Sequence, residues 1–185
     1  ATTAAGDTTA AAADSTAAAD AAAEAAKAAT GEGKKVGVAM PTQSSERWIN
    51  DGANMKKQLE ALGYEVDLQY ASNDVQTQVS QVENMISNGC ELLVIASIDG
   101  SSLGEPLGQA KEAGIPVISY DRLLMNSDAV TYYATFDNYM VGQKQGEYLV
   151  EALGLEENDG PFNIEMFTGD PADNNCNFFF GGAMD

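Results

Sequence analysis

The chain has 185 residues, which is enough for one ordinary domain and a tail, whereas two complete domains would be crowded. Its formal net charge is −19, with nine Lys and Arg residues and no histidine. Binding to nucleic acid or to an anionic membrane needs clustered basic side chains, so this composition argues against both. Repulsion between acidic groups favours a soluble monomer, as expected for a secreted or surface protein.

The two cysteines, Cys90 and Cys176, lie far apart and lack the short spacings of metal or redox sites, so we expect neither a metal nor a cofactor. Cys90 opens an apolar run and is predicted to be a small buried side chain. No stretch approaches the roughly 20 apolar residues of a transmembrane helix, and no basic and apolar leader precedes the rest. We therefore expect a chain from which a secretion signal has been removed, or one that was cloned without its signal.

The first 30 residues are more than half alanine and contain no large apolar side chain. Such a composition cannot build a core, so residues 1–33 are predicted to be a disordered tether. A tether at this position is typical of a lipoprotein held at a membrane surface. A tail without a specific role is the alternative.

From Lys35 onward, short apolar runs alternate with segments of helical period. Strands are predicted at 36–40, 66–70, 92–96, 116–120, 132–136 and 163–167, and helices at 48–62, 75–86, 103–110, 141–153 and 178–184. Glycines at 63, 89 and 114 end the first three helices as C-cap residues do. This alternation predicts an α/β fold, a doubly wound Rossmann-like parallel sheet with helices on both faces.

In doubly wound sheets, ligands bind beyond the carboxyl ends of the strands, where loops and helix N-termini converge. Polar or aromatic residues follow four of the predicted strands: Arg47 and Trp48, Asp121 and Arg122, Asp137 and Asn138, and finally Asp173, Asn174 and Asn175. Planar Asp, Asn and Arg groups can engage adjacent sugar hydroxyls in pairs, and an aromatic face can cover the C–H side of a sugar ring. The pattern therefore favours a carbohydrate ligand.

Each of these residues also has a purely structural interpretation. Trp48 lies on the apolar stripe of its own helix and could belong to the core. Asp121 and Arg122 could form an ion pair, and Asp137 could cap the helix that begins at Asn138. Asn174 and Asn175 could stabilise a turn.

Five segments resemble the periplasmic xylose-binding and multiple-monosaccharide-binding proteins of ABC importers, which have the type I periplasmic binding protein fold: AMPTQSSERWINDG, QVENMISNGCELLVIASIDG, VISYDRL, YYATFDN and GDPADNNC. The resemblance spans Lys34 to Met184. It implies that 34–185 is the N-terminal lobe of a two-lobed protein that closes over one monosaccharide, with the second lobe missing here. By motif position it implies sugar contacts from Arg47, Trp48, Asp121, Arg122, Asp137, Asn138, Asn174 and Asn175.

The resemblance further implies an extracytoplasmic protein, periplasmic or lipid-anchored, that delivers a pentose, hexose or sugar acid to the membrane subunits of an importer. A lone lobe should bind sugar at millimolar affinity or not at all, because half of its contacts would be missing. Cys176 stands where relatives usually carry a small apolar residue.

Two alternatives stay open. One is a sugar-sensing partner of a chemoreceptor or sensor kinase; a repressor is disfavoured, because an acidic alanine-rich segment stands where a basic DNA-binding motif would precede the domain. The other is a carbohydrate-acting enzyme using Asp121 and Asp137, although the chain has no phosphate-binding glycine motif and no histidine to activate a serine.

Overall fold

The computed structural model describes residue 31 and residues 33–185, so the predicted tether lies almost entirely outside the described residues. The centre is one parallel sheet in the order β2-β1-β3-β4-β5. Its strands are β1 (Lys35–Met40), β2 (Glu65–Tyr70), β3 (Leu92–Ile95), β4 (Val117–Tyr120) and β5 (Val130–Ala134). The first five predicted strands are confirmed, although β5 begins and ends two residues before its predicted bounds.

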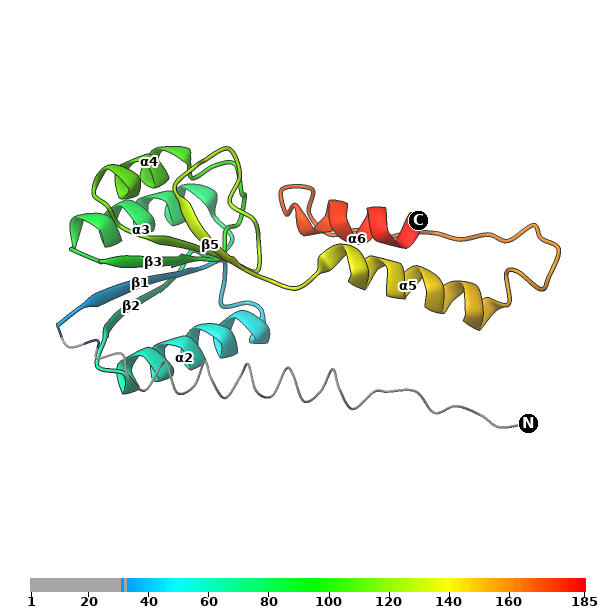
Figure 1. Ribbon diagram of the computed structural model, residues 1–185, viewed down its shortest axis with the longest axis horizontal. Coiled ribbons are helices and arrows are strands. Elements are labelled where there is room, and N and C mark those ends of the chain that lie inside the picture. The colour runs from blue at the N-terminus through cyan, green and yellow to red at the C-terminus, as the bar shows by residue number, and fades with distance from the viewer. Residues whose placement is uncertain (1–30, 32) are drawn as a thin grey trace, which may run out of the picture.

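Helices cover both faces of the sheet because side chains alternate along each strand. Helix α2 (Glu46–Ala61) lies on one face, and α3 (Val75–Ser87) and α4 (Gly104–Glu112) lie on the other (Figure 1). Along β3, Leu93 and Ile95 pack into the cluster under α3 and α4, whereas Val94 packs into the cluster that contains Trp48 of α2. The predicted doubly wound α/β architecture is therefore confirmed.

The strand order fixes where a ligand can bind. β1 pairs with β2 on one side and with β3 on the other, so the chain reverses its direction of travel across the sheet between β1 and β3. The loops after β1 and β3 consequently diverge and leave a crevice at the carboxyl ends of the strands. The segments after β4 and β5 end at the same edge.

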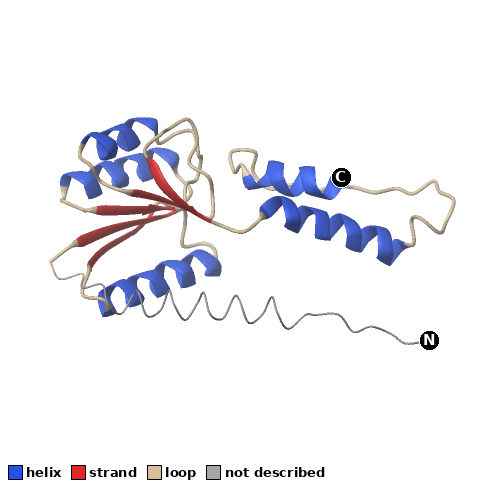
Figure 2. Ribbon diagram, viewed as in Figure 1, coloured by secondary structure: helices blue, strands red, loops and turns tan. Residues whose placement is uncertain are grey.

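The last two helices lie beyond the sheet. α5 (Asn138–Leu153) and α6 (Asn175–Met184) pack on each other, and Figures 1 and 2 show this helical pair beside the carboxyl end of β5. The two helices approach each other closely at Gly142 and Gly182. A Cβ at either position would collide with the backbone of the opposite helix, so the contact requires glycine there. Within the described part of the chain, no helix is long and apolar enough to cross a membrane.

The prediction of a sixth strand at 163–167 is wrong. Phe162, Ile164 and Met166 alternate as in a strand, but this segment forms no strand and runs back beside the helical pair from its far end. A strand exists only where a neighbouring backbone pairs with it, and the segment lies away from the free edge of β5 (Figure 2). Helix α6 begins three residues earlier than predicted, and α5 begins at Asn138, as the capping interpretation of Asp137 assumes, three residues before the apolar stripe. Asn138 and Asn175 therefore open helices.

The substitution Leu93→Ala should lower the free energy of unfolding by about 2–5 kcal/mol, because Leu93 on the central strand β3 is fully buried in the core cluster under α3 and α4. Urea unfolding followed by circular dichroism measures this change. The control is Ile49→Ala on α2, where a 41 % exposed side chain should change stability by less than about 1 kcal/mol. Equal losses in the two variants would contradict the described core.

The two thiols should differ in reactivity. Burial, reinforced by the charge of Asp67, raises the pKa of the Cys90 thiol to about 11, and its side chain is 1 % exposed. Cys176 is half-buried, and its thiol donates to the Asp170 carbonyl at 3.2 Å. A disulfide reagent at pH 8 should therefore modify Cys176 in the native chain and Cys90 only after unfolding, since the thiolate is the reacting form. The variant Cys176→Ser should lose the fast-reacting thiol.

Candidate functional site

Arg47 and Asp121 form the contact between the first turn of α2 and the end of β4. The Arg47 Nη2 donates to Asp121 Oδ2 at 2.5 Å, and its Nε lies 3.4 Å from Asp51 Oδ2. Partial burial lowers the pKa of the Arg47 guanidinium, but the hydrogen bond to Asp121 and the two carboxylate charges outweigh it and raise the pKa. Arg47 is therefore a permanent cation held between two carboxylates.

Trp48 lies beneath the guanidinium groups of the site. Its side chain is 6 % exposed, and it packs with Val36, Val38 and Val66 in the core cluster under α2. The Arg47 and Arg122 guanidinium carbons lie 4.6 and 5.3 Å from the ring centroid, within the range of cation–π attraction. The indole therefore supports the two arginines from below, which agrees with the core interpretation of Trp48.

Asp121 occupies a backbone conformation that few residues adopt. Its φ is +62°, in the left-handed region, where Asp is among the better tolerated side chains. Its N–H donates to the Ala134 carbonyl at 2.8 Å. Its own carbonyl accepts from Tyr133 Oη at 3.1 Å, Thr135 Oγ1 at 3.0 Å and Asn175 Nδ2 at 3.2 Å. These bonds compensate the strain at a site residue.

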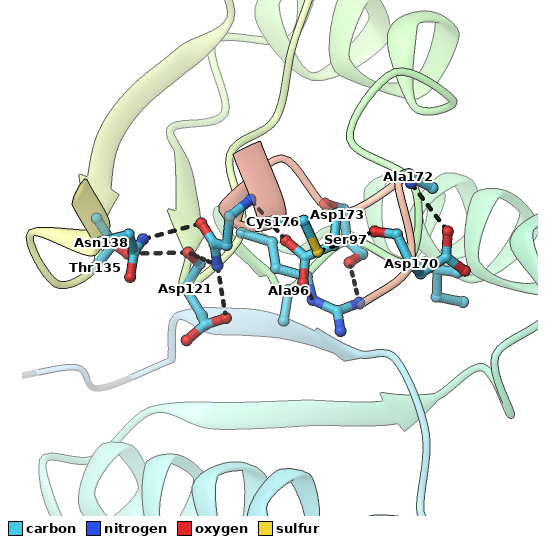
Figure 3. A network of polar contacts seen from close by, with 12 residues as sticks. Ala96, Ser97, Asp121, Thr135, Asn138, Asp170, Ala172, Asp173 and Cys176 are labelled. Atoms are coloured by element: carbon cyan, nitrogen blue, oxygen red, sulfur yellow. Dashed lines mark hydrogen bonds and ion pairs between the residues drawn. The ribbon is translucent and has the colours of Figure 1, made fainter. Parts of the chain in front are cut away.

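Arg122 connects three parts of the chain. Its Nη1 donates to the Ser97 carbonyl at 3.1 Å, and its Nε lies 2.9 Å from Asp173 Oδ2 in the loop before α6 (Figure 3). The buried Gln78 side chain holds the Ser97 loop, because it donates to the Ala96 carbonyl and accepts from the Ile98 N–H. The ion pair between Arg122 and Asp121, which was the structural alternative for these residues, is not formed, and each residue has another partner of opposite charge.

Asn138 and Asn175 join the helical pair to the sheet. Both are buried, and Asn138 Nδ2 donates to Asn175 Oδ1 at 2.9 Å. Asn175 Nδ2 in turn donates to the Asp121 carbonyl, so one chain of bonds runs from α5 through α6 to β4 (Figure 3). Both side chains lie beside Asp121, as the strand-end pattern predicts.

The side chains of Asp137 and Asn174 form hydrogen bonds at the N-termini of α5 and α6, respectively. The exposed Asp137 carboxylate accepts the Met140 N–H at 3.0 Å and caps α5, as one sequence interpretation proposed. Asn174 Oδ1 accepts from Asn177 Nδ2 at 3.1 Å within the first turn of α6. Both side chains are thus engaged in local structure.

A cavity of about 220 Å³ opens beside these groups, and its lining residues are Arg47, Tyr120, Asp121, Ala134, Thr135 and Phe136. Burial, together with the hydrogen bond to Asp51, raises the pKa of Tyr120, so its hydroxyl stays protonated and donates to Asp51 Oδ2 at 3.1 Å. A second cavity of similar volume adjoins Phe167 and Cys176 but has no charged side chain in its lining. Three larger cavities, of about 340–450 Å³, are lined by residues of α5, α6 and the segment after α5. The first cavity is the candidate binding site because it lies at the carboxyl ends of β4 and β5, where ligands bind in such sheets.

Sequence reasoning missed several residues that build this site. The sequence does carry a signal for Asp51 as a partner of Arg47, because Asp51 stands four residues after Arg47 and therefore shares its helix face. Asp173 was noted as a strand-end residue but was not among the predicted contacts, although it pairs with Arg122. Tyr120, Thr135 and Phe136 carry no pattern of their own, and only the packing of β4 against β5 brings them together.

Residues 36–185 match the protein family described as the periplasmic binding protein domain. The chain belongs to this family. It is 57 % identical over 149 residues to the multiple sugar-binding periplasmic protein SbpA of Azospirillum brasilense, a match that covers 80 % of this chain and 42 % of that protein. It is 37 % identical to the D-xylose-binding periplasmic protein of Escherichia coli, covering 81 % of this chain and 43 % of that protein.

A solved structure gives the same assignment. An ABC transporter solute-binding protein from Clostridium phytofermentans, with bound β-D-glucose, is 74 % identical with a TM-score of 0.80. The match covers 82 % of this chain and 47 % of that one. This periplasmic binding protein chain therefore spans less than half the length of the relatives that it matches.

The substitution Asn175→Ala should loosen the helical pair from the sheet. It removes the bonds to Asn138 and to Asp121, and the loss of such buried partners costs about 1–3 kcal/mol. Residual dipolar couplings measure the effect: one alignment tensor should fit both parts of the wild-type chain, and the variant should need two. The control is Asn177→Ala, whose exposed side chain bonds only within α6. A single tensor in the Asn175 variant would contradict the inferred role.

Proposed function

We propose that this chain is the sugar-contacting part of the substrate-binding component of an ABC importer and binds a monosaccharide outside the cytoplasm. The observation that carries the proposal is the cavity at the end of β4 and β5, where Arg47, Asp121 and Thr135 converge beside an aromatic ring. A guanidinium, a carboxylate and a hydroxyl together offer donors and acceptors, which matches the dual character of sugar hydroxyls. Membership of the periplasmic binding protein family supports the same function.

The ligand that we propose is a neutral pentose or hexose. The two arginines of the site face three carboxylates, because Arg47 pairs with Asp51 and Asp121, and Arg122 pairs with Asp173. A sugar acid would therefore meet guanidinium groups that are already neutralised, next to excess negative charge. The glucose-bound relative at 74 % identity supports a neutral sugar.

The proposed mechanism is a shift between open and closed arrangements of the two sides of the site. The sheet supplies Arg47, Asp121 and Arg122, and the helical pair supplies Asn138 and Asn175. A sugar that contacts both sides stabilises their approach, and no bond is made or broken. This assignment refines the single lobe 34–185 expected from the sequence, because the helical pair then forms the start of the opposite side.

Partners and location are proposals of the same kind. The membrane subunits of an importer would bind the closed form, and a chemoreceptor or sensor kinase would be an additional partner that binds the same form. A tether formed by the alanine-rich segment would hold the protein as a lipoprotein. We also propose that the chain is not an enzyme, since Asp121 is paired with Arg47 and Asp137 caps α5, so neither carboxylate is free for acid–base chemistry.

A sugar titration followed by ¹⁵N–¹H NMR tests the proposal on the chain itself. D-Glucose or D-xylose should cause saturable shifts at Arg47, Asp121 and Thr135 with a millimolar dissociation constant, and D-galacturonate should bind more weakly. The variant Asp121→Ala should weaken binding roughly tenfold or more, because a charge-assisted hydrogen bond contributes about 1.5–3 kcal/mol. The control is Lys144→Ala, an exposed residue paired only with Glu147.

Two results would contradict the proposal. The first is the absence of saturable shifts up to several hundred millimolar sugar both in the folded chain and in a folded version extended to the length of its relatives, which would supply the contacts that this chain lacks. The second is tighter binding of D-galacturonate than of the neutral sugars, which would overturn the proposed ligand class. Release of an aryl group from aryl glycosides would instead favour the enzyme.

A further inference from the structure

Gln78 is a polar side chain among the buried residues of α3. It is 1 % exposed and shares its helix face with Val82 and Met85, whereas amide side chains mostly lie at protein surfaces. Both ends of its carboxamide are paired: Nε2 donates to the Ala96 carbonyl at 3.0 Å, and Oε1 accepts from the Ile98 N–H at 2.8 Å. A buried amide costs free energy unless it is hydrogen-bonded, so its place in the core depends on these two bonds.

The Gln78 amide takes the place of a backbone that proline cannot supply. The register of β1 and β3 would next put Pro41 opposite Ser97. In a parallel ladder, the residue at position 41 would donate to the carbonyl before Ser97 and accept from the N–H after it. Pro41 has no N–H, and its carbonyl accepts from the Asn73 N–H instead. Gln78 makes both missing bonds through its side chain and so keeps Ser97 extended beyond the end of β3.

The extended Ser97 presents its carbonyl to Arg122. Successive residues of a strand direct their backbone groups to opposite sides, so the Ser97 carbonyl faces the segment after β4 and accepts from Arg122 Nη1 at 3.1 Å (Figure 3). The backbone of Arg122 is fixed as well, because its carbonyl accepts from the buried Ser119 Oγ at 2.7 Å. Arg122 Nε lies 2.9 Å from Asp173 Oδ2. A guanidinium held at Ser97 therefore reaches the loop before α6.

We infer that Gln78 is a positioning residue for sugar binding and acts through Ser97 and Arg122. The inference rests on the proposed function, in which the sheet and the helical pair close around a sugar. The pairing of Arg122 with Asp173 crosses from one side of the site to the other. An Arg122 whose acceptor at Ser97 can move holds the two sides less firmly. Sugar binding must then supply the order that Gln78 provides in the wild type, which weakens the affinity.

The two arginines of the chain, Arg47 and Arg122, give a direct readout of this role. The arginine ¹⁵Nε–¹Hε spectrum contains one signal from each. Gln78→Met has a side chain of similar length but removes both hydrogen bonds, so it should shift the Arg122 signal and change the Arg47 signal little. The same variant should weaken binding of D-glucose roughly three- to tenfold. An NMR titration measures this in whichever version, this chain or the extended one, binds the sugar.

The matched control is Val82→Ala, one turn further along the same helix. Val82 is fully buried, so its truncation lowers the free energy of unfolding, but its side chain makes no hydrogen bond to the loop after β3. This variant should leave the Arg122 signal and the affinity for D-glucose unchanged. The comparison separates a positioning role from a loss of stability.

Gln78→Glu adds a pH readout. A protonated carboxyl keeps one donor and one acceptor for the two backbone groups, whereas a carboxylate has no donor and would face the Ala96 carbonyl. Because burial disfavours the charged form, the variant should bind D-glucose like the wild type at about pH 5.5 and roughly three- to tenfold more weakly at about pH 8. The neighbouring carboxylates of Asp74 and Asp99 are present in both proteins, so the wild type controls for their titration.

The outcomes separate this inference from the proposed function. If the wild type binds D-glucose and Gln78→Met binds it equally well, the positioning role is overturned while the binding function stands. Equal weakening by Gln78→Met and Val82→Ala would also overturn it, because the effect would then follow stability alone. If Gln78→Met does not fold, Gln78→Glu decides, and an affinity that does not change with pH overturns the inference. If the folded wild type binds no sugar in either version, the proposed function fails and this inference fails with it.

Discussion

The backbone carbonyl of Asp121 is the point on which the architecture of the site depends. It accepts from β5 through Tyr133, from the connecting segment through Thr135 and from α6 through Asn175. The left-handed φ of +62° takes the backbone out of strand geometry at this residue, directly after β4. The same residue directs its carboxylate at Arg47 of α2. One strained residue thereby fixes four chain segments around a single cavity.

The contact between the sheet and the helical pair is polar. The bonds of Asn175 and the pairing of Arg122 with Asp173 cross it, whereas the apolar packing of α5 is directed at α6. Polar contacts of this kind are individually modest in net free energy but costly to leave half-made. They are therefore suited to an interface that opens and closes, because the bonds form together in one arrangement and exchange with water in the other. A binding protein of the proposed kind needs this property.

The sequence predicts the sheet well because each of its elements carries a local signal. The apolar runs at 36–40 and 92–96 and the stripe from Val75 to Ile86 each indicate their structure without reference to neighbours. The prediction at 163–167 is wrong for the complementary reason, since alternation alone cannot tell whether a partner strand is within reach. The site was predictable as a cluster at the strand ends. Its internal pairings were not, because Arg122 finds Asp173 across 51 residues of chain and Tyr120 finds Asp51 across 69.

Trp48 shows that residue type and sequence position alone do not establish what a side chain does in the folded protein. In the sequence, a tryptophan beside an arginine at a strand end indicates a stacking platform, and the helical stripe through Trp48 indicates core. The structure buries the ring against β1 and beside two guanidinium groups, as the core interpretation expects, while contact between Trp48 and a sugar stays a prediction. The Arg47 guanidinium is held by its hydrogen bond to Asp121, and the Arg122 guanidinium is held by its ion pair with Asp173, in which the buried Nε forms no hydrogen bond to any described residue. The contact of the indole with Arg122 joins α2 to the segment after β4, and no spacing in the sequence predicts it, because only the folding of the sheet brings these two residues together.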